Sequence, residues 1–357
     1  MENRKLAQLY LNNRILTDEH GQPTVMVYFP KFYLDEVMEG ASHTLHPAFL
    51  IDGVELDGLY LSKFQNVVID GLAYSLPNVE PTTHIDFDSA LLSCANKGEG
   101  FHMMTAMEWG AVALWCQKNG WLPFGNNDVG KDIRESETVA RITCLDQDRQ
   151  ICKVATGTGP VEWSHNRKDD GIYDLNGNVW EWNGGIRLVF GELQALVDNN
   201  GASARCSQGA DSAAWRAIDG RTGEWIRPNG EGTTKNSIKL DNIGGKWQYV
   251  TDPITSAEKR PRFSPFTELT VQDSICPKAK ELLCALGCLP WNDHGIDREV
   301  CFYANNGAEE RMIFRGGRWG QGLNAGLFKT CMDDPRTYAG AAVGFRSAYA
   351  EKTPKIF

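Results

Sequence analysis

The side chains of this chain best suited to metal or redox chemistry are its ten cysteines. Cys284 and Cys288 stand four residues apart in AKELLCALGC, a spacing that places both side chains on one face of a helix. A zinc site would need two further ligands nearby, and neither a Cys-x-x-Cys pair nor a pair of histidines provides them. We therefore expect Cys284 and Cys288 to be small buried hydrophobic residues.

The chain carries no motif of a hydrolase or of a nucleotide-binding enzyme. It lacks the Gly-x-Ser-x-Gly elbow, the His-Glu-x-x-His metal motif and the phosphate-binding loop, and its histidines are isolated. The glycines of ATGTGP, residues 155–160, are followed by no Lys-Ser/Thr and therefore indicate a turn. We expect no active site of these classes.

The composition is that of an acidic globular protein. Hydrophobic residues make up 42% of the 357 residues, and 11 tryptophans with 36 glycines indicate tight turns around large aromatic anchors. The formal net charge of −10 argues against a nucleic-acid partner, which would require a basic face. We find no apolar segment typical of a signal peptide and no run long enough to span a membrane. We expect synthesis in the cytoplasm without a signal peptide, reduced thiols and no membrane insertion.

Strands and two helices are predicted in the first third of the chain. TVMVYFPKFYL, Thr24 to Leu34, is typical of a strand, and residues 46–66 of two short strands with a turn at Asp52-Gly53. A helix is expected over 86–98, with Leu91, Leu92 and Ala95 on one face and Gly98 as its C-terminal stop. A second helix, over 105–120, begins with the capping box Thr105-x-x-Glu108.

A long irregular insertion is predicted over residues 187–306. This segment is rich in glycine, asparagine and serine, as in DNNGASARCSQGADS and RPNGEGTTKNS, and a helical period returns only near 278–286. Because more than a hundred such residues are unusual inside one domain, we expect an insertion with short strands of its own.

Three sequence motifs are specific enough to indicate a fold. They are GFHMMTAMEW (100–109), GIYDLNGNVWEW (171–182) and the C-terminal pair FRGGRW…VGFRSA. Trp180 and Trp182 alternate as on a strand, so both indoles should lie on one face. Gly316-Gly317 allows positive φ or a close backbone approach, and Gly344-Phe345-Arg346 should form a terminal strand.

These words resemble those of the formylglycine-generating-enzyme/sulfatase-modifying-factor family, a version of the C-type-lectin fold. The resemblance covers roughly residues 100–182 and 311–349, and extends more faintly back to His46. It implies an α+β protein with the C-type-lectin fold of the formylglycine-generating-enzyme-like subtype. The expected organisation is an N-terminal β-containing segment (1–45) and a C-type-lectin-like domain (46–357) that carries the insertion over about 187–306.

The catalytic part of that family is missing. Its enzyme uses two cysteines soon after the Arg-Gly-Gly word to oxidise a sulfatase cysteine with copper and oxygen. Here residues 318–325 contain no cysteine, and the later Cys331 is single, whereas a copper site needs at least two soft ligands. We expect no enzyme and no catalytic cofactor. The resemblance leaves open a structural calcium ion held by Asn178 and Glu181, the alternative being a turn at Asn178 and a capping role for Glu181.

The C-terminal words are also similar to those of the variable proteins of diversity-generating retroelements, which include phage receptor-binding proteins of the tropism-determinant kind. In those proteins a fixed C-type-lectin scaffold displays a diversified C-terminal region, which corresponds here to residues 315–346. The resemblance implies ten ligand-binding positions: Arg318, Gly320, Gln321, Leu323, Lys329, Cys331, Asp333, Tyr338, Gly340 and Ala342. It assigns a structural frame to Trp180, Trp182, Gly316, Gly317, Trp319, Phe345 and Arg346, with a contact role as the alternative for Trp319.

The expected function is therefore display of a variable binding surface. The resemblance implies a protein or glycan receptor on a cell surface as partner, a homo-oligomer such as a trimer, and a location on a phage tail or on a surface. Two alternatives remain open at this point: a copper-dependent oxidase of the formylglycine-generating type, and a purely structural virion protein.

Overall fold

The computed structural model describes residues 10–351 and builds them mainly from strands, with few helices, so the chain is an α+β protein. Residues 1–9, which belong to the predicted N-terminal segment 1–45, lie outside the described residues, as do 352–357. No helix among the described residues is long and apolar enough to cross a membrane.

A five-stranded antiparallel sheet joins the two ends of the described chain. Its strands, in spatial order, are β1 (Arg14–Thr17), β2 (Pro23–Pro30), β5 (Gly58–Ser62), β21 (Ser347–Tyr349) and β8 (Phe101–Met103). The predicted strand over 24–34 is β2, which pairs with β5 from Met26↔Ser62 to Pro30↔Gly58. The N-terminal segment thus shares a sheet with the C-terminal strand, and no linker separates them.

A second, 12-stranded sheet contains the strands of the C-terminal motif pair FRGGRW…VGFRSA. Its main path is β15 (Arg262–Pro265), β17 (Cys301–Ala304), β19 (Gly326–Met332), β18 (Arg311–Gly316), β9 (Trp180–Val189), β10 (Glu192–Ala195), β13 (Lys239–Ile243), β14 (Lys246–Val250) and β16 (Thr270–Val271). Beside this path lie β11 (Arg216–Ile218), β12 (Trp225–Ile226) and β20 (Val343–Phe345), of which β20 pairs in parallel with β9. Six strands of this path lie within the predicted insertion, as do β11 and β12, and β9 runs into it. The backbone of the insertion therefore extends the main sheet.

Two small hairpins complete the strands. One pairs β3 (Leu50–Ile51) with β4 (Val54–Glu55), and the other pairs β6 (Val67–Ile69) with β7 (Leu72–Tyr74). The first turns at Asp52 and Gly53, whose φ angles of 53° and 74° are those of the tight turn predicted there.

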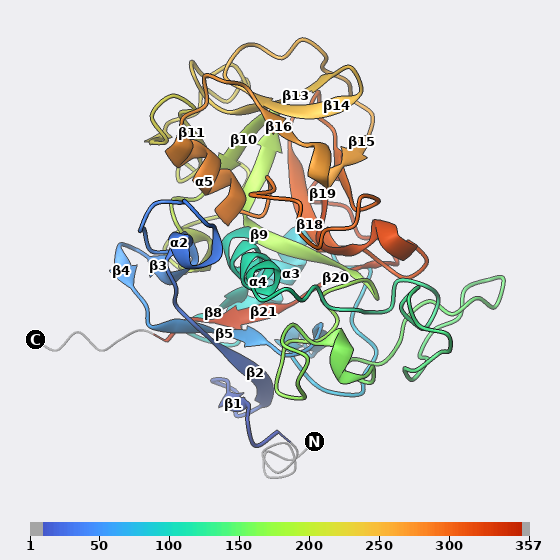
Figure 1. Cartoon of the computed structure of the whole chain (residues 1–357). Coiled ribbons are helices and arrows are strands. Elements are labelled where there is room, and N and C mark those ends of the chain that lie inside the picture. The colour runs from blue at the N-terminus through green and yellow to red at the C-terminus, as the bar shows by residue number, and fades with distance from the viewer. Residues whose placement is uncertain (1–9, 352–357) are drawn as a thin grey trace, which may run out of the picture.

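The helices are α2 (Leu34–Val37), α3 (Phe87–Ala95), α4 (Ala106–Lys118) and α5 (Pro277–Ala285), with single 3-10 turns at η1 (Pro47–Phe49), η2 (Val161–Trp163), η3 (Asn200–Ala202), η4 (Phe266–Glu268) and η5 (Gly322–Asn324). The capping box of α4 is formed as predicted, because Thr105 and Glu108 bond each other's backbone N–H groups. Figure 1 shows α4 at the centre, between the five-stranded sheet below and the strands of the insertion above.

The face that holds Leu91, Leu92 and Ala95 is not the buried face of the first helix. In α3 the buried residues are Phe87, Ala90, Ser93 and Cys94, whereas Leu91 is only half-buried and Leu92 is 59% exposed. Phe87 packs edge-on against Trp182, 5.9 Å between ring centroids, and this contact sets the rotation of the helix. The larger aromatic side chain at the start of the helix outweighs the two leucines that follow it.

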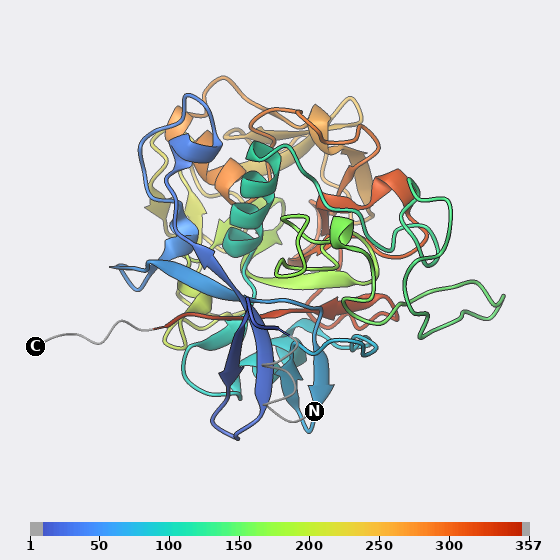
Figure 2. The ribbon, with the colours of Figure 1, turned by 60° about the horizontal axis from the view of Figure 1, so that its bottom comes forward.

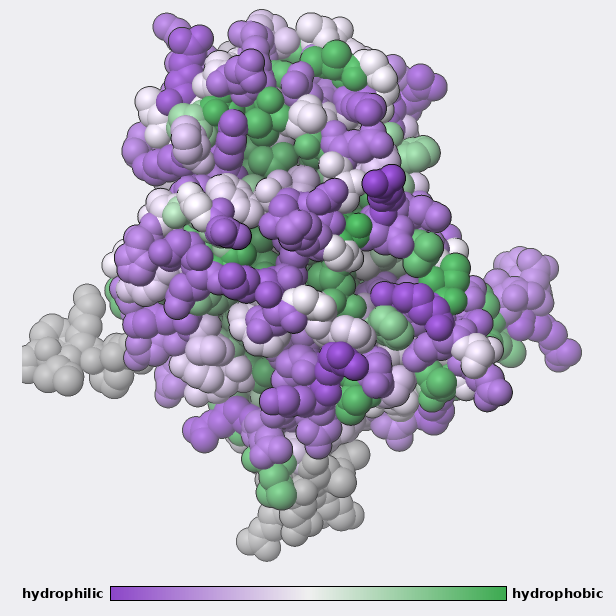
Figure 3. Space-filling model, in the orientation of Figure 1, coloured by the Kyte–Doolittle hydropathy of each residue, from purple (hydrophilic) through white to green (hydrophobic). Residues whose placement is uncertain are grey.

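Three apolar clusters fill the interior of the described residues, and two of them pack against the C-terminal strands. The larger one surrounds α4, where Trp109 is fully buried and donates its indole N–H to the carbonyl of Leu327, at 2.7 Å. The smaller one lies against β9 and holds Trp180, Trp182 and Phe345 together with Phe314. Both indoles lie 4.9 Å from the Phe314 ring, so they share one face of β9 as predicted. On the surface seen in Figure 3, hydrophilic residues dominate and apolar ones occur in small groups.

We predict that Gly110→Ala destabilises the protein by roughly 1–3 kcal/mol, because of overpacking where α4 crosses the end of α5. A Cβ atom at Gly110 would lie 1.9 Å from the carbonyl oxygen of Ala285. Denaturant unfolding measures the change. Gly209→Ala is the matched control, since its Cβ would meet nothing closer than 3.4 Å, and it should stay within about 0.5 kcal/mol of wild type. Equal effects of the two changes would contradict this packing.

Candidate ligand-binding surface

Two loops connect the C-terminal strands and form the candidate surface. The first loop, residues 317–325, joins β18 to β19 and contains η5, and the second loop, residues 333–342, joins β19 to β20. The exposed residues of the two loops are Gly320, Pro335, Thr337, Tyr338, Ala339 and Ala341. The half-buried residues are Arg318, Trp319, Gln321, Gly322, Leu323, Asn324, Asp333, Asp334, Arg336, Gly340 and Ala342.

The first joint of this region is Arg315, whose side chain is fully buried. Its guanidinium donates to the carbonyls of Leu286, at 2.7 Å, and Gly287, at 2.6 Å, just beyond the C-terminus of α5. A cation is favoured there because the last carbonyls of a helix carry partial negative charge. Gly316 and Gly317 follow with φ of 86° and 84°, values that glycine adopts without strain, and they turn the chain into the first loop.

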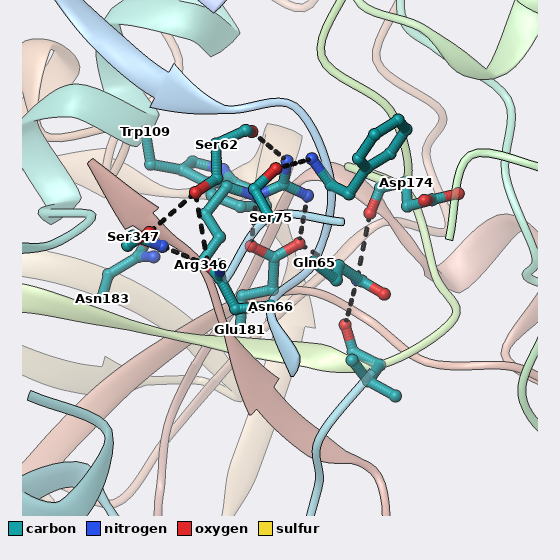
Figure 4. A network of polar contacts seen from close by, with 12 residues as sticks. Ser62, Gln65, Asn66, Ser75, Trp109, Asp174, Glu181, Asn183, Arg346 and Ser347 are labelled. Atoms are coloured by element: carbon teal, nitrogen blue, oxygen red, sulfur yellow. Dashed lines mark hydrogen bonds and ion pairs between the residues drawn. The ribbon is translucent and has the colours of Figure 1, made fainter. Parts of the chain in front are cut away.

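The second joint is Arg346, which lies at the centre of a buried polar network (Figure 4). Its Nε and Nη2 donate to the two carboxylate oxygens of Glu181, at 2.6 and 2.7 Å. The remaining N–H groups donate to the carbonyls of Ser62, at 2.9 Å, and Tyr173, at 3.0 Å. A bidentate carboxylate with extra carbonyl acceptors is the environment that a buried guanidinium needs.

Asn178 and Glu181, the candidate calcium ligands, belong to this network. Gln65 connects them, because Asn178 Nδ2 donates to Gln65 Oε1 and Gln65 Nε2 donates to Glu181 Oε1, at 2.9 and 3.0 Å. Asn178 Oδ1 already accepts from Asn126 Nδ2 and from the backbone N–H of Val154. Hydrogen-bond donors therefore occupy the oxygens that calcium would need, so these side chains do not fit the ion.

The backbone of the second loop is held from outside by four main-chain hydrogen bonds. The N–H groups of His84, Phe87, Trp180 and Met312 donate to the carbonyls of Gly340, Arg336, Ala342 and Asp334, at 3.0, 3.0, 2.8 and 3.0 Å. The first loop is held in the same manner, since Gly322 N–H donates to Asn127 O, at 2.8 Å, and Trp319 N–H to Asn178 O, at 3.3 Å. These bonds involve main-chain atoms only. They can form whichever residue occupies a loop position, except that proline has no N–H to donate at residues 319 and 322.

One side chain of the second loop has a fixed role. Arg336 makes a bidentate ion pair with Glu310, at 2.7 and 2.9 Å, and a further bond to Asp88, at 2.7 Å. Burial opposes these charges, but the pairing with Arg336 and Arg187 holds the pKa of Glu310 below its usual range. Arg336 thus anchors the middle of the loop.

Two of the ten predicted ligand-binding positions do not face the solvent. Lys329 is 0% exposed and Cys331 is 7% exposed. Both lie on β19, a central strand flanked by β17 and β18, and their side chains pack on the smaller core beside Tyr303. The prediction that these two are exposed is wrong, because the neighbouring strands and Asn324, which accepts a hydrogen bond from the Lys329 ammonium, cover them.

The other eight predicted positions do reach the surface, together with Trp319. Gly320 and Tyr338 are exposed, and the remaining six are half-buried. Trp319, predicted as part of the frame, is only half-buried because it follows the two left-handed glycines into the first loop, and the Arg318 guanidinium lies 5.5 Å from its ring centroid. The six other frame residues are all buried.

An acidic corner lies where β19 enters the second loop. The thiol of Cys331 and the carboxylates of Asp333 and Asp334 lie within 4.8 Å of one another. Burial, followed by the neighbouring Asp333 carboxylate, raises the pKa of Asp334 to about 6, while the Arg311 guanidinium opposes the shift. This corner gives one end of the surface a negative, pH-sensitive character.

The insertion adds aromatic residues that the sequence did not indicate. Phe263 on β15 is 57% exposed and stacks on Tyr303 of β17, 5.1 Å between centroids. The Lys329 ammonium lies 4.3 Å from the Tyr303 ring, directly beside the C-terminal strands. On the far side of the first loop, a hollow of about 310 Å³ is lined by Leu323 together with residues of 122–134 and 295–300. The long-range pairing of β15, β17 and β19 brings Phe263 and Tyr303 to the site.

Comparisons with known proteins give distant structural likenesses. No family model and no curated protein sequence matches the chain. The structure is similar to Treponema denticola variable protein 1, with a TM-score of 0.32 and 10% identity over 94% of this chain and 98% of that one. It is also similar to a Major Tropism Determinant U1 variant, with a TM-score of 0.30 and 10% identity over 94% of this chain and 71% of that one. These are proteins of the kind that the sequence words resemble. At such TM-scores the likeness carries no functional argument, which has to come from the residues of this chain.

We predict that Glu181→Gln destabilises the protein by about 3–5 kcal/mol, because it leaves the buried Arg346 guanidinium without its counter-charge. Chemical denaturation measures the loss. The control is Glu55→Gln, which removes one of the two surface carboxylates that pair with Lys31, at 2.8 Å, and should cost at most about 1 kcal/mol. A small effect of Glu181→Gln would contradict the role of this pair as a joint.

We also predict a pH-dependent stability difference between wild type and Lys329→Met. Burial lowers the pKa of Lys329 from 10.5 to about 8, so between these pH values the unfolded chain binds a proton that the folded chain has lost. Wild-type stability should therefore rise relative to the variant from pH 8 to about 10.5, and stay lowest below pH 8. Unfolding free energies at pH 7, 9 and 10 test this, and a constant difference would show that the ammonium is not desolvated.

Proposed function

We propose that this chain is a ligand-binding protein of C-type-lectin fold, related to retroelement variable proteins, which displays side chains from the two C-terminal loops. The observation that carries the proposal is the way the loops are held. Their backbones hydrogen-bond to residues 84, 87, 127, 178, 180 and 312, while most of their side chains are exposed or half-buried. A surface built in this way keeps its shape when its side chains change.

The chemistry of the surface suits recognition. Tyr338 is 39% exposed and stacks at 6.4 Å on the buried Phe314, so it offers a rigid contact area at a small entropic cost. Arg318 and Gln321 supply hydrogen-bond donors and an acceptor. The exposed Gly320, Ala339 and Ala341, whose side chains are small or absent, determine the contour of the surface. Phe263 and Tyr303 extend the same surface beyond the C-terminal region.

The ligand class and the setting follow from the family resemblance alone. We propose a protein or glycan receptor on a cell surface as the partner, and presentation on a phage tail or other surface by a homo-oligomer such as a trimer. Several copies on one particle would strengthen weak single contacts by roughly 10² or more, because the later contacts form intramolecularly.

The oxidase alternative has no residue set to support it in the first loop. Positions 318–325 contain no cysteine, and Cys331 is buried on the side of β19 that packs on the smaller core. Incubation of the protein with copper, oxygen and a cysteine-bearing sulfatase peptide separates the two proposals. Aldehyde formation would overturn the display function.

The proposal is tested most simply in the DNA that surrounds the gene. A variable protein requires a reverse-transcriptase gene nearby and a near-copy of the segment that encodes Arg315 to Arg346. Related genes should differ from one another mainly at codons for the two loops. Identical loop sequences in related genes that differ elsewhere would contradict display.

We predict that simultaneous replacement of Thr337, Tyr338, Ala339 and Ala341 by serine changes the free energy of unfolding by no more than about 2 kcal/mol in total. Each is exposed, and exposed substitutions typically change stability by about half a kcal/mol. Denaturant unfolding with circular dichroism measures the change. As a contrast, Gly344→Ala alone should cost more than each of these, since its Cβ would lie 2.5 Å from the carbonyl oxygen of Thr82. An unfolded fourfold variant would contradict the proposal that this surface tolerates substitution.

A further inference from the structure

Cys144 and Cys152 face each other across a hairpin outside the candidate surface. Residues 141–154 fold back on themselves within the green segment that projects from the body of the molecule in Figures 1 and 2. Isolated antiparallel bridges join Ile142 to Val154 and Leu145 to Ile151. Both bridges have the same register, so Cys144 stands opposite Cys152 between them. The backbone N–H of Cys152 donates to the carbonyl of Cys144, at 2.9 Å.

This arrangement brings the two thiols to one side of the hairpin. Residues directly opposite each other in an antiparallel pair project to the same face, with Cβ atoms roughly 4.5–5.5 Å apart. A disulfide needs a Cβ separation of roughly 3.5–4.5 Å, so a small approach of the two strands is sufficient. The thiols already influence each other, because burial, followed by the nearby Cys144 and Asp146, raises the pKa of Cys152 to about 11.

The two cysteines also differ in access. Cys144 is half-buried and can meet a reagent from solution, whereas Cys152 is only 3% exposed. Cys284 and Cys288 make a useful contrast, because they are closer to each other in sequence, four residues apart instead of eight, but both are buried in the larger core.

We propose that Cys144 and Cys152 are a dithiol site that closes to an intrachain disulfide when the folded protein meets a small-molecule disulfide such as oxidised glutathione. The Cys144 thiolate attacks one sulfur of the reagent, forms a mixed disulfide and releases one glutathione thiolate. The Cys152 thiolate then attacks the Cys144 sulfur and releases the second glutathione thiolate. The two cysteines lose two electrons and two protons, and the reagent is reduced to two thiols.

The hairpin that the disulfide would close is hydrogen-bonded to residues that support the candidate surface. Asn126 Nδ2 donates to the carbonyl of Cys152, at 2.8 Å, and the N–H of Val154 donates to Asn178 Oδ1, at 2.9 Å. The backbone carbonyls of Asn178 and of Asn127, the residue after Asn126, in turn accept hydrogen bonds from the first loop. Closure of the hairpin therefore restrains a segment that supports this loop. The inference itself does not depend on the proposed function.

Peptide mapping of the oxidised protein tests the site. The purified full chain is incubated with oxidised glutathione under native conditions, its remaining thiols are blocked with iodoacetamide, and it is digested with trypsin without reductant. Cleavage after Arg141, Arg149 and Lys153 yields the fragments ITCLDQDR (142–149) and QICK (150–153), each with a single cysteine. We expect mass spectrometry to find these two fragments joined, and to find them apart after reduction.

Single variants provide the controls. Cys144→Ser should abolish the joined fragments and leave Cys152 without a glutathione adduct, because the buried thiol alone is poorly accessible, so that Cys152 is alkylated only when iodoacetamide is added in denaturant. Cys152→Ser should stop the reaction at a glutathione adduct on Cys144. Circular dichroism confirms that each variant is folded before oxidation. A wild-type protein that retains only the adduct on Cys144, or that joins Cys284 to Cys288 in preference, would overturn the proposal.

Discussion

The ion pair between Arg346 and Glu181 is the constraint on which the rest of the structure depends. A guanidinium that is 0% exposed is stabilised by acceptors for its N–H groups, and for Arg346 these acceptors come from β9, from the end of β5 and from Tyr173. One residue thereby fixes the junction between the two sheets. Its chain neighbours form β20 on one side and β21 on the other, so the same pair also sets where the second loop ends.

The mode of attachment explains how a fixed frame coexists with a tolerant surface. Joints at Arg315, Arg336 and Arg346 place three buried or half-buried guanidiniums against carbonyls or carboxylates. Between the joints, the loops are held by main-chain hydrogen bonds. Because those bonds do not involve loop side chains, changes at Thr337 or Ala341 alter the surface without loosening the frame. β19 is the exception, since its buried Lys329 retains an ammonium over Tyr303 at an electrostatic cost.

Local sequence words predicted what depends on neighbours along the chain. The capping box of α4, the turn at Asp52-Gly53 and the common face of Trp180 and Trp182 all follow from spacings of a few residues. The burial of Lys329 and Cys331 could not be predicted in this way, because it depends on the pairing of β19 with both β17 and β18. The same holds for Phe263, which reaches the surface only through the order β15-β17-β19, and for the Gln65 bridge that connects Asn178 to Glu181.

The central claim is that residues 315–346 combine an intolerant frame with tolerant loops, and a saturation scan read by protease resistance tests it most directly. Every residue of the segment is replaced by all others, and the folded fraction of each variant is measured. We predict that most substitutions at the exposed positions 337–339 and 341 keep wild-type resistance, while most at 315–317, 326–332 and 343–346 lose it. Loops as intolerant as the strands that flank them would contradict the account.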